Sequence, residues 1–197
     1  MLDIDVLQVA TFLVIVLIGL AWYLSYSAAR LDRLHAKVEG AMSALDAQLV
    51  RRAESTLELA NSGALDPASS LLLAEVATES LERTTEQPVG DDLLDGQHFG
   101  GREDVESDLS AVLRAALTTD VVEALRREPG SLADEAVDRI AATGLRVQLA
   151  RRFHNDAVRD VRRVRDKSVV RAFRLAGRAA LPDRVDFDDE LPVALRS

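Results

Sequence analysis

The side chains that most often carry catalysis or bind metal are few in this chain of 197 residues, and they are scattered. It has no cysteine, and its three histidines, His35, His98 and His154, lie in different segments without the short spacing that metal ligands need. The pair Gly100-Gly101 lacks the Lys-Ser/Thr that follows the glycines of phosphate-binding loops, and no nucleophile motif is present. We therefore expect no enzymatic activity, no metal and no cofactor.

Two polar residues interrupt an otherwise apolar helical stripe. His154 is expected to be a buried or half-buried core residue rather than a general base. Asn155 lies in the middle of the same segment, although asparagine is a poor helix former. The preferred interpretation is an amide that bonds to a neighbouring helix and fixes its register, with Asp46 or Arg52 as partner. Contact with a ligand is the alternative.

The strongest charge feature is residues 151–178, which hold ten basic and three acidic residues in a chain of net charge −9. One interpretation is a solvated helix face with i,i+3 and i,i+4 ion pairs. Another is an amphipathic helix over 169–181 that lies on anionic lipid. Its possible membrane-surface contacts are Arg171, Phe173, Arg174 and Arg178. Nucleic acid is not expected as a partner, because the pI is about 4.9 and no recognition motif is present.

These residues must be positioned by a chain whose hydropathy is sharply divided. No residue between Asp5 and Arg30 is charged, and the 24 residues from Val6 to Ala29 would span about 36 Å as a helix, enough for a hydrocarbon core of about 30 Å. The acidic start and the length of the apolar run argue against a cleaved signal peptide. We expect a transmembrane helix over residues 6–29.

The flanking charges predict the orientation of this helix. Residues 1–5 contain two aspartates and no basic residue, whereas Arg30, Arg33 and Lys37 follow the apolar run. Basic residues stay on the cytoplasmic side. The sequence therefore predicts a single-pass cell-membrane protein with a short stub outside and its remaining residues in the cytoplasm.

The cytoplasmic part has helical periodicity throughout. Apolar residues recur every three or four positions from Leu31 to Leu57, and Asp66 and Ser131 are placed to cap later helices. The expected helices are 30–61, 67–83, 104–127 and 131–165, with a mobile acidic loop at 84–103. The fold class is all-α: the transmembrane helix continues into an antiparallel bundle of about four long helices over 30–178, followed by a C-terminal tail at 179–197. A coiled-coil homo-oligomer through the seam at Leu31–Leu57 is an alternative.

Two segments together resemble the LemA family. The stretch from Leu149 to Val161 reads LARRFHNDAVRDV and is similar to the Arg-Arg-aromatic-aromatic-Asn-x-Ala-Val sequence of the family's last long helix. The matching residues are Arg151, Arg152, Phe153, Asn155, Ala157 and Val158. The stretch VEGAMSALDAQLVRRAE from Val38 to Glu54 resembles the early cytoplasmic part of the family. His154 and Met42 stand where the family usually has aromatic residues, which indicates a divergent member.

The resemblance implies a bacterial, membrane-anchored helical bundle with no known enzymatic activity. We expect the bundle to serve as an interaction or scaffold module at the membrane, with membrane lipid and an unidentified protein as partners. A regulator that senses a small ligand or a partner by opening of the bundle is the alternative.

Overall fold

The computed structural model describes residues 2–86, 99, 101–167, 170–171 and 181–196. Its helices are α1 (Leu2–Asn61), α2 (Pro67–Glu86), α3 (Arg102–Ala116), α4 (Thr119–Leu125) and α5 (Leu132–Arg165), and a single turn of 3-10 helix, η2, spans Val193–Leu195. None of the described residues forms a strand. The all-α fold predicted from the sequence is confirmed.

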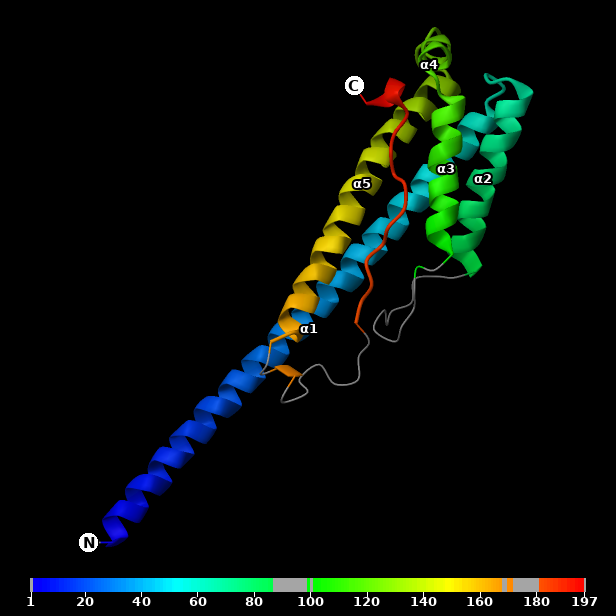
Figure 1. Cartoon of the computed structure of the whole chain (residues 1–197). Coiled ribbons are helices and arrows are strands. Elements are labelled where there is room, and N and C mark those ends of the chain that lie inside the picture. Colours follow the sequence, from blue (N-terminus) through cyan, green and yellow to red (C-terminus); the bar gives the residue numbers. More distant parts are fainter. Residues whose placement is uncertain (1, 87–98, 100, 168–169, 172–180, 197) are drawn as a thin grey trace.

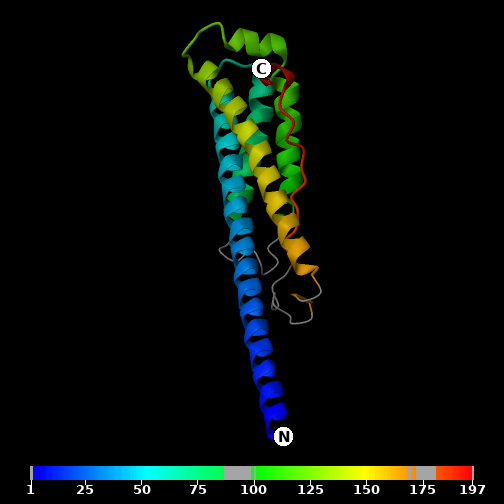
Figure 2. The ribbon, with the colours of Figure 1, turned by 90° about the vertical axis from the view of Figure 1, so that its left-hand side faces the viewer.

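Four helices form the bundle in the order α1, α2, α3 and α5, and each runs antiparallel to the one before it (Figure 1). Helix α1 packs against both α5 and α2, and α2 packs against α3. The short helix α4 lies across the end of the bundle farthest from the N-terminus (Figure 2). The bundle predicted from helical periodicity is therefore present.

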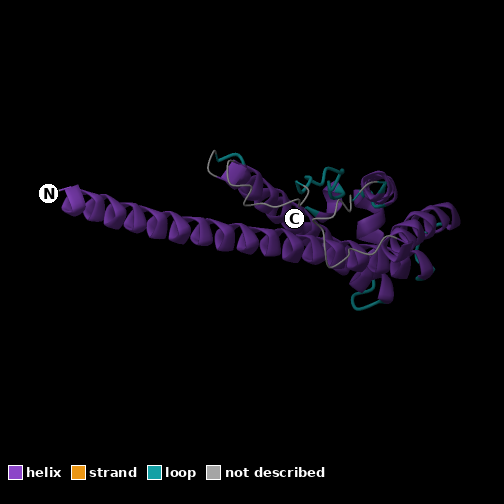
Figure 3. Ribbon diagram, turned by 90° about the horizontal axis from the view of Figure 1, so that it is seen from below, coloured by secondary structure: helices purple, strands orange, loops and turns teal. Residues whose placement is uncertain are grey.

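Helix α1 has two different halves. The N-terminal half projects beyond all the other described helices (Figures 1 and 3), and its large apolar side chains from Leu7 to Leu20 are exposed. From Leu31 onward the helix is amphipathic, and Val38, Leu45 and Leu49 are buried within the chain. The seam that also suggested a coiled coil is thus packed against the chain's own helices.

Local capping signals in the sequence are confirmed. The Asp66 carboxylate accepts hydrogen bonds from the amides of Ala68 and Ser69 at 3.1 and 3.0 Å, and so caps α2. The Ser131 hydroxyl accepts from the Asp134 amide at 3.2 Å and caps α5. These side chains satisfy amides that have no partner within the helix.

The expected single helix over 104–127 is wrong. It is broken into α3 and α4, because Thr118 adopts an extended backbone and its hydroxyl accepts from the Val121 amide. Leu117 ends α3 and is buried in the main core. A threonine that caps a new helix competes with continuation of the old one, and this signal was overlooked in the sequence.

The expected loop at 84–103 is shorter than predicted at both ends. Helix α2 continues through Thr84 to Glu86, and α3 already begins at Arg102. Arg102 is buried and pairs with Asp46 of α1 and with Glu106 one turn later in α3, which fixes the start of α3. Residues 87–98 and 100, which contain most of the predicted acidic loop, lie outside the described residues.

Residues 181–196 form an extended strap along the bundle. Helices α3 and α5 make few direct contacts with each other. The strap runs between them from near the lower end of α5 to η2 (Figures 1 and 2). These residues were predicted to form a tail after the bundle. In the structure they pack between α3 and α5 and close the fourth side of the bundle.

Candidate functional site

The candidate site is the groove between α3 and α5 that the strap fills. Polar side chains of α3 and α5 form its walls, and apolar side chains of α1 and α5 form its floor. The strap is extended, so successive side chains point to opposite sides. Accordingly Val185 and Phe187 are buried, whereas Asp186 and Asp188 are exposed.

Asn155 on α5 forms hydrogen bonds with the strap backbone at a single residue. Its amide Nδ2 donates to the Val185 carbonyl at 2.9 Å, and its Oδ1 accepts from the Val185 amide at 2.9 Å. The expected partners, Asp46 and Arg52, are wrong: both belong to a different cluster of charges. The side chain was predicted to bond to a neighbouring helix, whereas it bonds to the extended residues 181–196.

Other wall residues also bind the strap's main chain. Gln148 donates from Nε2 to the Asp189 carbonyl at 2.8 Å, and the Ser107 hydroxyl accepts from the Asp188 amide at 3.0 Å. Arg162 donates twice to the Pro182 carbonyl, at 3.0 and 2.9 Å. The walls thus satisfy backbone groups of an extended chain that has no neighbouring strand.

Three arginines of the walls pair with carboxylates of the strap. The closest pairs are Arg114–Asp188 at 2.5 Å, Arg151–Asp189 at 2.7 and 3.0 Å, and Arg162–Asp183 at 2.7 Å. The hydrogen bond from Arg114 lowers the pKa of Asp188 below its ordinary value. One acidic wall residue also contributes, since the Glu103 carboxylate accepts from the Asp186 amide at 2.6 Å. The groove is predominantly basic and its occupant is acidic.

The floor of the groove is apolar. Val185 and Phe187 of the strap pack into a buried cluster whose other members are Met42, Leu45, Leu49 and Val147. The Phe187 ring stacks on Phe99, with ring centroids 6.2 Å apart, and the Arg151 guanidinium lies over its ring at 5.5 Å. Such aromatic and cation–π contacts add to the free energy of burial.

At the far end of the strap, the main chain of α5 is approached closely. A Cβ atom placed on Gly144 would lie 2.3 Å from Cδ2 of Leu191. Any larger residue at this position would therefore force the Leu191 side chain to shift from its buried position.

A buried charge cluster joins α1, α2 and α3 next to the groove. Glu106 is fully buried, and Arg52, 3% exposed, binds its carboxylate at 2.7 Å. The Ser80 hydroxyl donates to the same carboxylate at 2.8 Å, and Arg52 also donates to the Ser110 hydroxyl at 3.0 Å. A buried carboxylate is tolerated when several donors replace water.

Arg102 connects this cluster to the groove. Its guanidinium pairs with Asp46 and, at 3.4 Å, with Glu106. It also lies 5.2 Å from the centre of the Phe99 ring, which stacks on Phe187 of the strap. The position of α3, and with it one wall of the groove, is fixed by these charges.

The residues of the predicted structural motif lie in three different places. Arg151 and Asn155 contact the strap, as described. Ala157 and Val158 are fully buried and pack with Val38 of α1. Arg152 and Phe153 point outward, and Phe153 is 57% exposed. The motif thus combines groove contacts, α1–α5 packing and an exposed surface.

The histidines do not form a site. His154 is buried as expected, and its Nε2 lies 3.3 Å from the Asp183 carbonyl. Burial lowers its pKa, although contact with main-chain carbonyls opposes the shift. Burial and the charge of Arg165 also lower the pKa of His35. His98 lies outside the described residues, and no three acidic or histidine side chains among those described are grouped to hold a metal.

The basic segment is only partly described. Its expected helix-face ion pairs are present between Asp156 and Arg159 at 2.8 Å and, more loosely, between Asp160 and Arg163 at 4.0 Å. Arg171 is exposed. The other three possible membrane contacts, Phe173, Arg174 and Arg178, lie outside the described residues.

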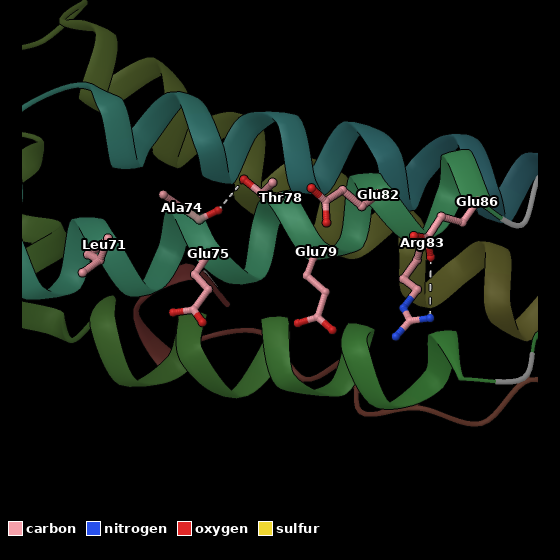
Figure 4. A pocket seen from close by; sticks show the side chains of 8 residues that line it. All are labelled: Leu71, Ala74, Glu75, Thr78, Glu79, Glu82, Arg83 and Glu86. Carbon is pink, nitrogen blue, oxygen red and sulfur yellow. Dashed lines mark hydrogen bonds and ion pairs between the residues drawn. The ribbon is translucent and has the colours of Figure 1, made fainter.

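A second hollow follows the exposed side of α2. Figure 4 shows its lining, which comes from α2 alone and includes Glu75, Glu79, Glu82 and Glu86. Arg83 pairs with Glu86 at 3.7 Å. A row of carboxylates on one helix is an ordinary solvated face, and none of the residues that line this hollow is buried.

The strap was not predicted from the sequence, and neither were Ser107, Arg114 and Gln148 in the walls of the groove. The sequence nevertheless contains a signal for it. Val185 and Phe187 alternate with aspartates, and this period of two is typical of a half-buried extended chain. The expectation of a bundle followed by a tail hid this pattern.

Comparisons with protein-family models, with curated proteins and with solved structures found no match to this chain.

Proposed function

We propose that this chain is a membrane-anchored, non-enzymatic protein of the LemA type, whose helical bundle is an interaction module on the cytoplasmic face of the membrane. The observation that carries the proposal is the continuity of α1. The N-terminal half of this helix is apolar and is not covered by other parts of the chain. Its C-terminal half packs in the bundle against α2 and α5.

The burial pattern supports an anchor rather than a core helix. The apolar part of α1 has a mean hydropathy of 2.2, and none of it is buried. A core helix of comparable composition would be covered by its neighbours, because large exposed apolar surfaces are unfavourable in water. Trp22, Tyr23 and Tyr26 are exposed near the end of this part, where aromatic rings favour the lipid headgroup region.

The charges around the anchor support the cytoplasmic location. Arg30, Arg33 and Lys37 follow the apolar part within about two helical turns, and residues 1–5 contain two aspartates and no basic side chain. This asymmetry is typical of a helix whose C-terminal end faces the cytoplasm. The LemA assignment itself is supported by the two matching segments, which lie on the paired helices α1 and α5.

The test is the membrane association of the full-length chain. Leu13→Arg with Leu17→Arg places two charges in the apolar half of α1, where each costs about 3 kcal/mol on insertion. We expect the wild-type chain to resist extraction from membranes at alkaline pH and this variant to be extracted. The matched control is Leu71→Arg with Leu72→Arg, which changes two exposed leucines of α2 and should leave the chain in the membrane.

Orientation is tested with reporters fused after Ser197. A fluorescent protein that matures in the cytoplasm should be active there, and a phosphatase that requires export should be inactive. Extraction of the wild-type chain would contradict the anchor, and an active phosphatase would contradict the cytoplasmic location.

A further inference from the structure

The strap is bound in the way that proteins bind an extended peptide. Its main chain is held by Asn155, Gln148 and Ser107, whose contacts do not depend on the strap's side chains. Main-chain hydrogen bonds of this kind provide affinity for any extended segment, and pockets for alternate side chains provide selectivity. Here the pockets accept Val185 and Phe187.

The charges define the occupant further. Arg114, Arg151 and Arg162 face the strap from both walls, and each pairs with an aspartate of the strap. A segment without acidic residues would leave these guanidinium groups without their partners. The groove therefore selects an acidic segment with apolar residues two positions apart.

We propose that the groove between α3 and α5 is a docking site for an extended acidic segment of a partner protein, and that residues 181–196 occupy it as an intramolecular competitor. This inference deepens the proposed role as an interaction module. It rests on the groove and not on the anchor, so each can fail without the other.

The competitor determines when the partner binds. A segment on the same chain has an effective concentration in the millimolar range. A partner must displace it by higher affinity or greater abundance. Weakening the strap without altering the walls should therefore open the site to a peptide added from outside.

The experiment uses the full-length chain in detergent and a fluorescent synthetic peptide with the sequence of residues 181–196. The strap-weakened host carries Val185→Ser and Phe187→Ser, which remove the two buried anchors. We expect this host to bind the peptide at least tenfold more tightly than the wild-type chain does. Adding Asn155→Ala to the host should then weaken binding at least fivefold, whereas adding Arg152→Ala, an exposed neighbour, should not.

Peptide variants test the recognition itself. A peptide with asparagine in place of Asp183, Asp188 and Asp189 should bind at least tenfold more weakly than the original. A peptide with serine in place of Val185 and Phe187 should not bind measurably. If the double-serine host loses its helical circular dichroism, a second host with Asp188→Asn and Asp189→Asn replaces it. These substitutions weaken the ion pairs of the strap but keep Val185 and Phe187 in the apolar floor.

Peptide binding no tighter in either folded host than in the wild-type chain would overturn the proposal. So would binding that is insensitive to Asn155→Ala. Sedimentation of the wild-type chain completes the test. If the wild-type chain is a dimer and the Asn155→Ala variant is not, the groove is occupied by the strap of a second copy, and the proposal of a different partner is overturned. A monomer supports it.

Discussion

Asn155 binds both main-chain hydrogen-bonding groups of Val185, at 2.9 Å each. A side-chain amide presents a donor and an acceptor on the same side, as the N–H and C=O of one residue do in an antiparallel strand, so Asn155 pairs with Val185 much as a residue of a neighbouring strand would. The strap is thereby held in register, with Val185 and Phe187 toward the floor.

Replacing Asn155 should release the strap locally. In Asn155→Ala the Val185 amide loses its acceptor and its carbonyl loses its donor, at a cost of roughly 1–3 kcal/mol for the two hydrogen bonds. Amide hydrogen exchange at Val185 should accelerate by roughly ten- to hundredfold, while exchange in α1 and α5 remains slow. Mass spectrometry of the strap peptides measures this directly.

The neighbouring residue provides the control. Arg152 lies in the same motif but is exposed, so Arg152→Ala should leave the exchange of Val185 unchanged. Equal protection in Asn155→Ala and in the wild-type chain would show that the amide does not hold the strap.

Breaking the buried ion pair between Arg52 and Glu106 should strongly destabilise the bundle. Arg52→Met leaves the Glu106 carboxylate fully buried with fewer donors, and we expect the free energy of unfolding to fall by about 3–5 kcal/mol. Urea unfolding in detergent, followed by circular dichroism, measures the loss. A double-mutant cycle with Glu106→Gln should give a large coupling energy, because the two side chains share one contact.

An exposed pair with similar geometry serves as the comparison. Arg139 binds Glu58 at 2.6 Å, but the two side chains are 43% and 56% exposed. Arg139→Met should cost less than about 1 kcal/mol, since water screens and replaces the lost contact. Similar losses in Arg52→Met and Arg139→Met would refute the importance of burial here.

The stability of the bundle should decrease on mild acidification. Burial lowers the pKa of His154 in the folded state, so below the unfolded value of about 6.5 the unfolded chain takes up a proton that the folded chain does not. Stability is complete above this pH and decreases as the pH falls toward the lowered pKa of the folded state. His35 contributes in the same direction.

The slope with pH separates this effect from a change in packing. Between pH 7.5 and 5.5 the free energy of unfolding of His154→Gln should fall less steeply than that of the wild-type chain. His154→Gln combined with His35→Gln should be nearly flat over this range. An unchanged slope in both variants would be inconsistent with lowered histidine pKa values.

The sequence was sufficient for what depends on local signals. The spacing of apolar residues in α1 and the caps at Asp66 and Ser131 predicted helices that the structure contains. The absence of charge over residues 6–29 predicted a helix long and apolar enough to cross a membrane, which α1 contains.

What depended on distant parts of the chain could not be predicted. The start of α3 is fixed by Arg102, whose partner Asp46 is 56 residues away. Asn155 was recognised as unusual in a helix, but its partner lies 30 residues further on, in a segment without regular structure. No periodic pattern in the sequence specifies such pairings.

The central claim is that residues 181–196 fill the groove between α3 and α5, and a disulfide tests it most directly. The chain has no cysteine of its own, and a Cβ on Gly144 would lie 3.2 Å from Cγ of Leu191, within the reach of a disulfide between these positions. Gly144→Cys with Leu191→Cys should therefore form an intramolecular disulfide almost completely on mild oxidation, detected by mass and by gel mobility without reductant. Leu145→Cys with Leu191→Cys, which uses the exposed neighbouring position, should not. Two thiols of the first pair that stay free and reactive in a fully helical protein would contradict the account.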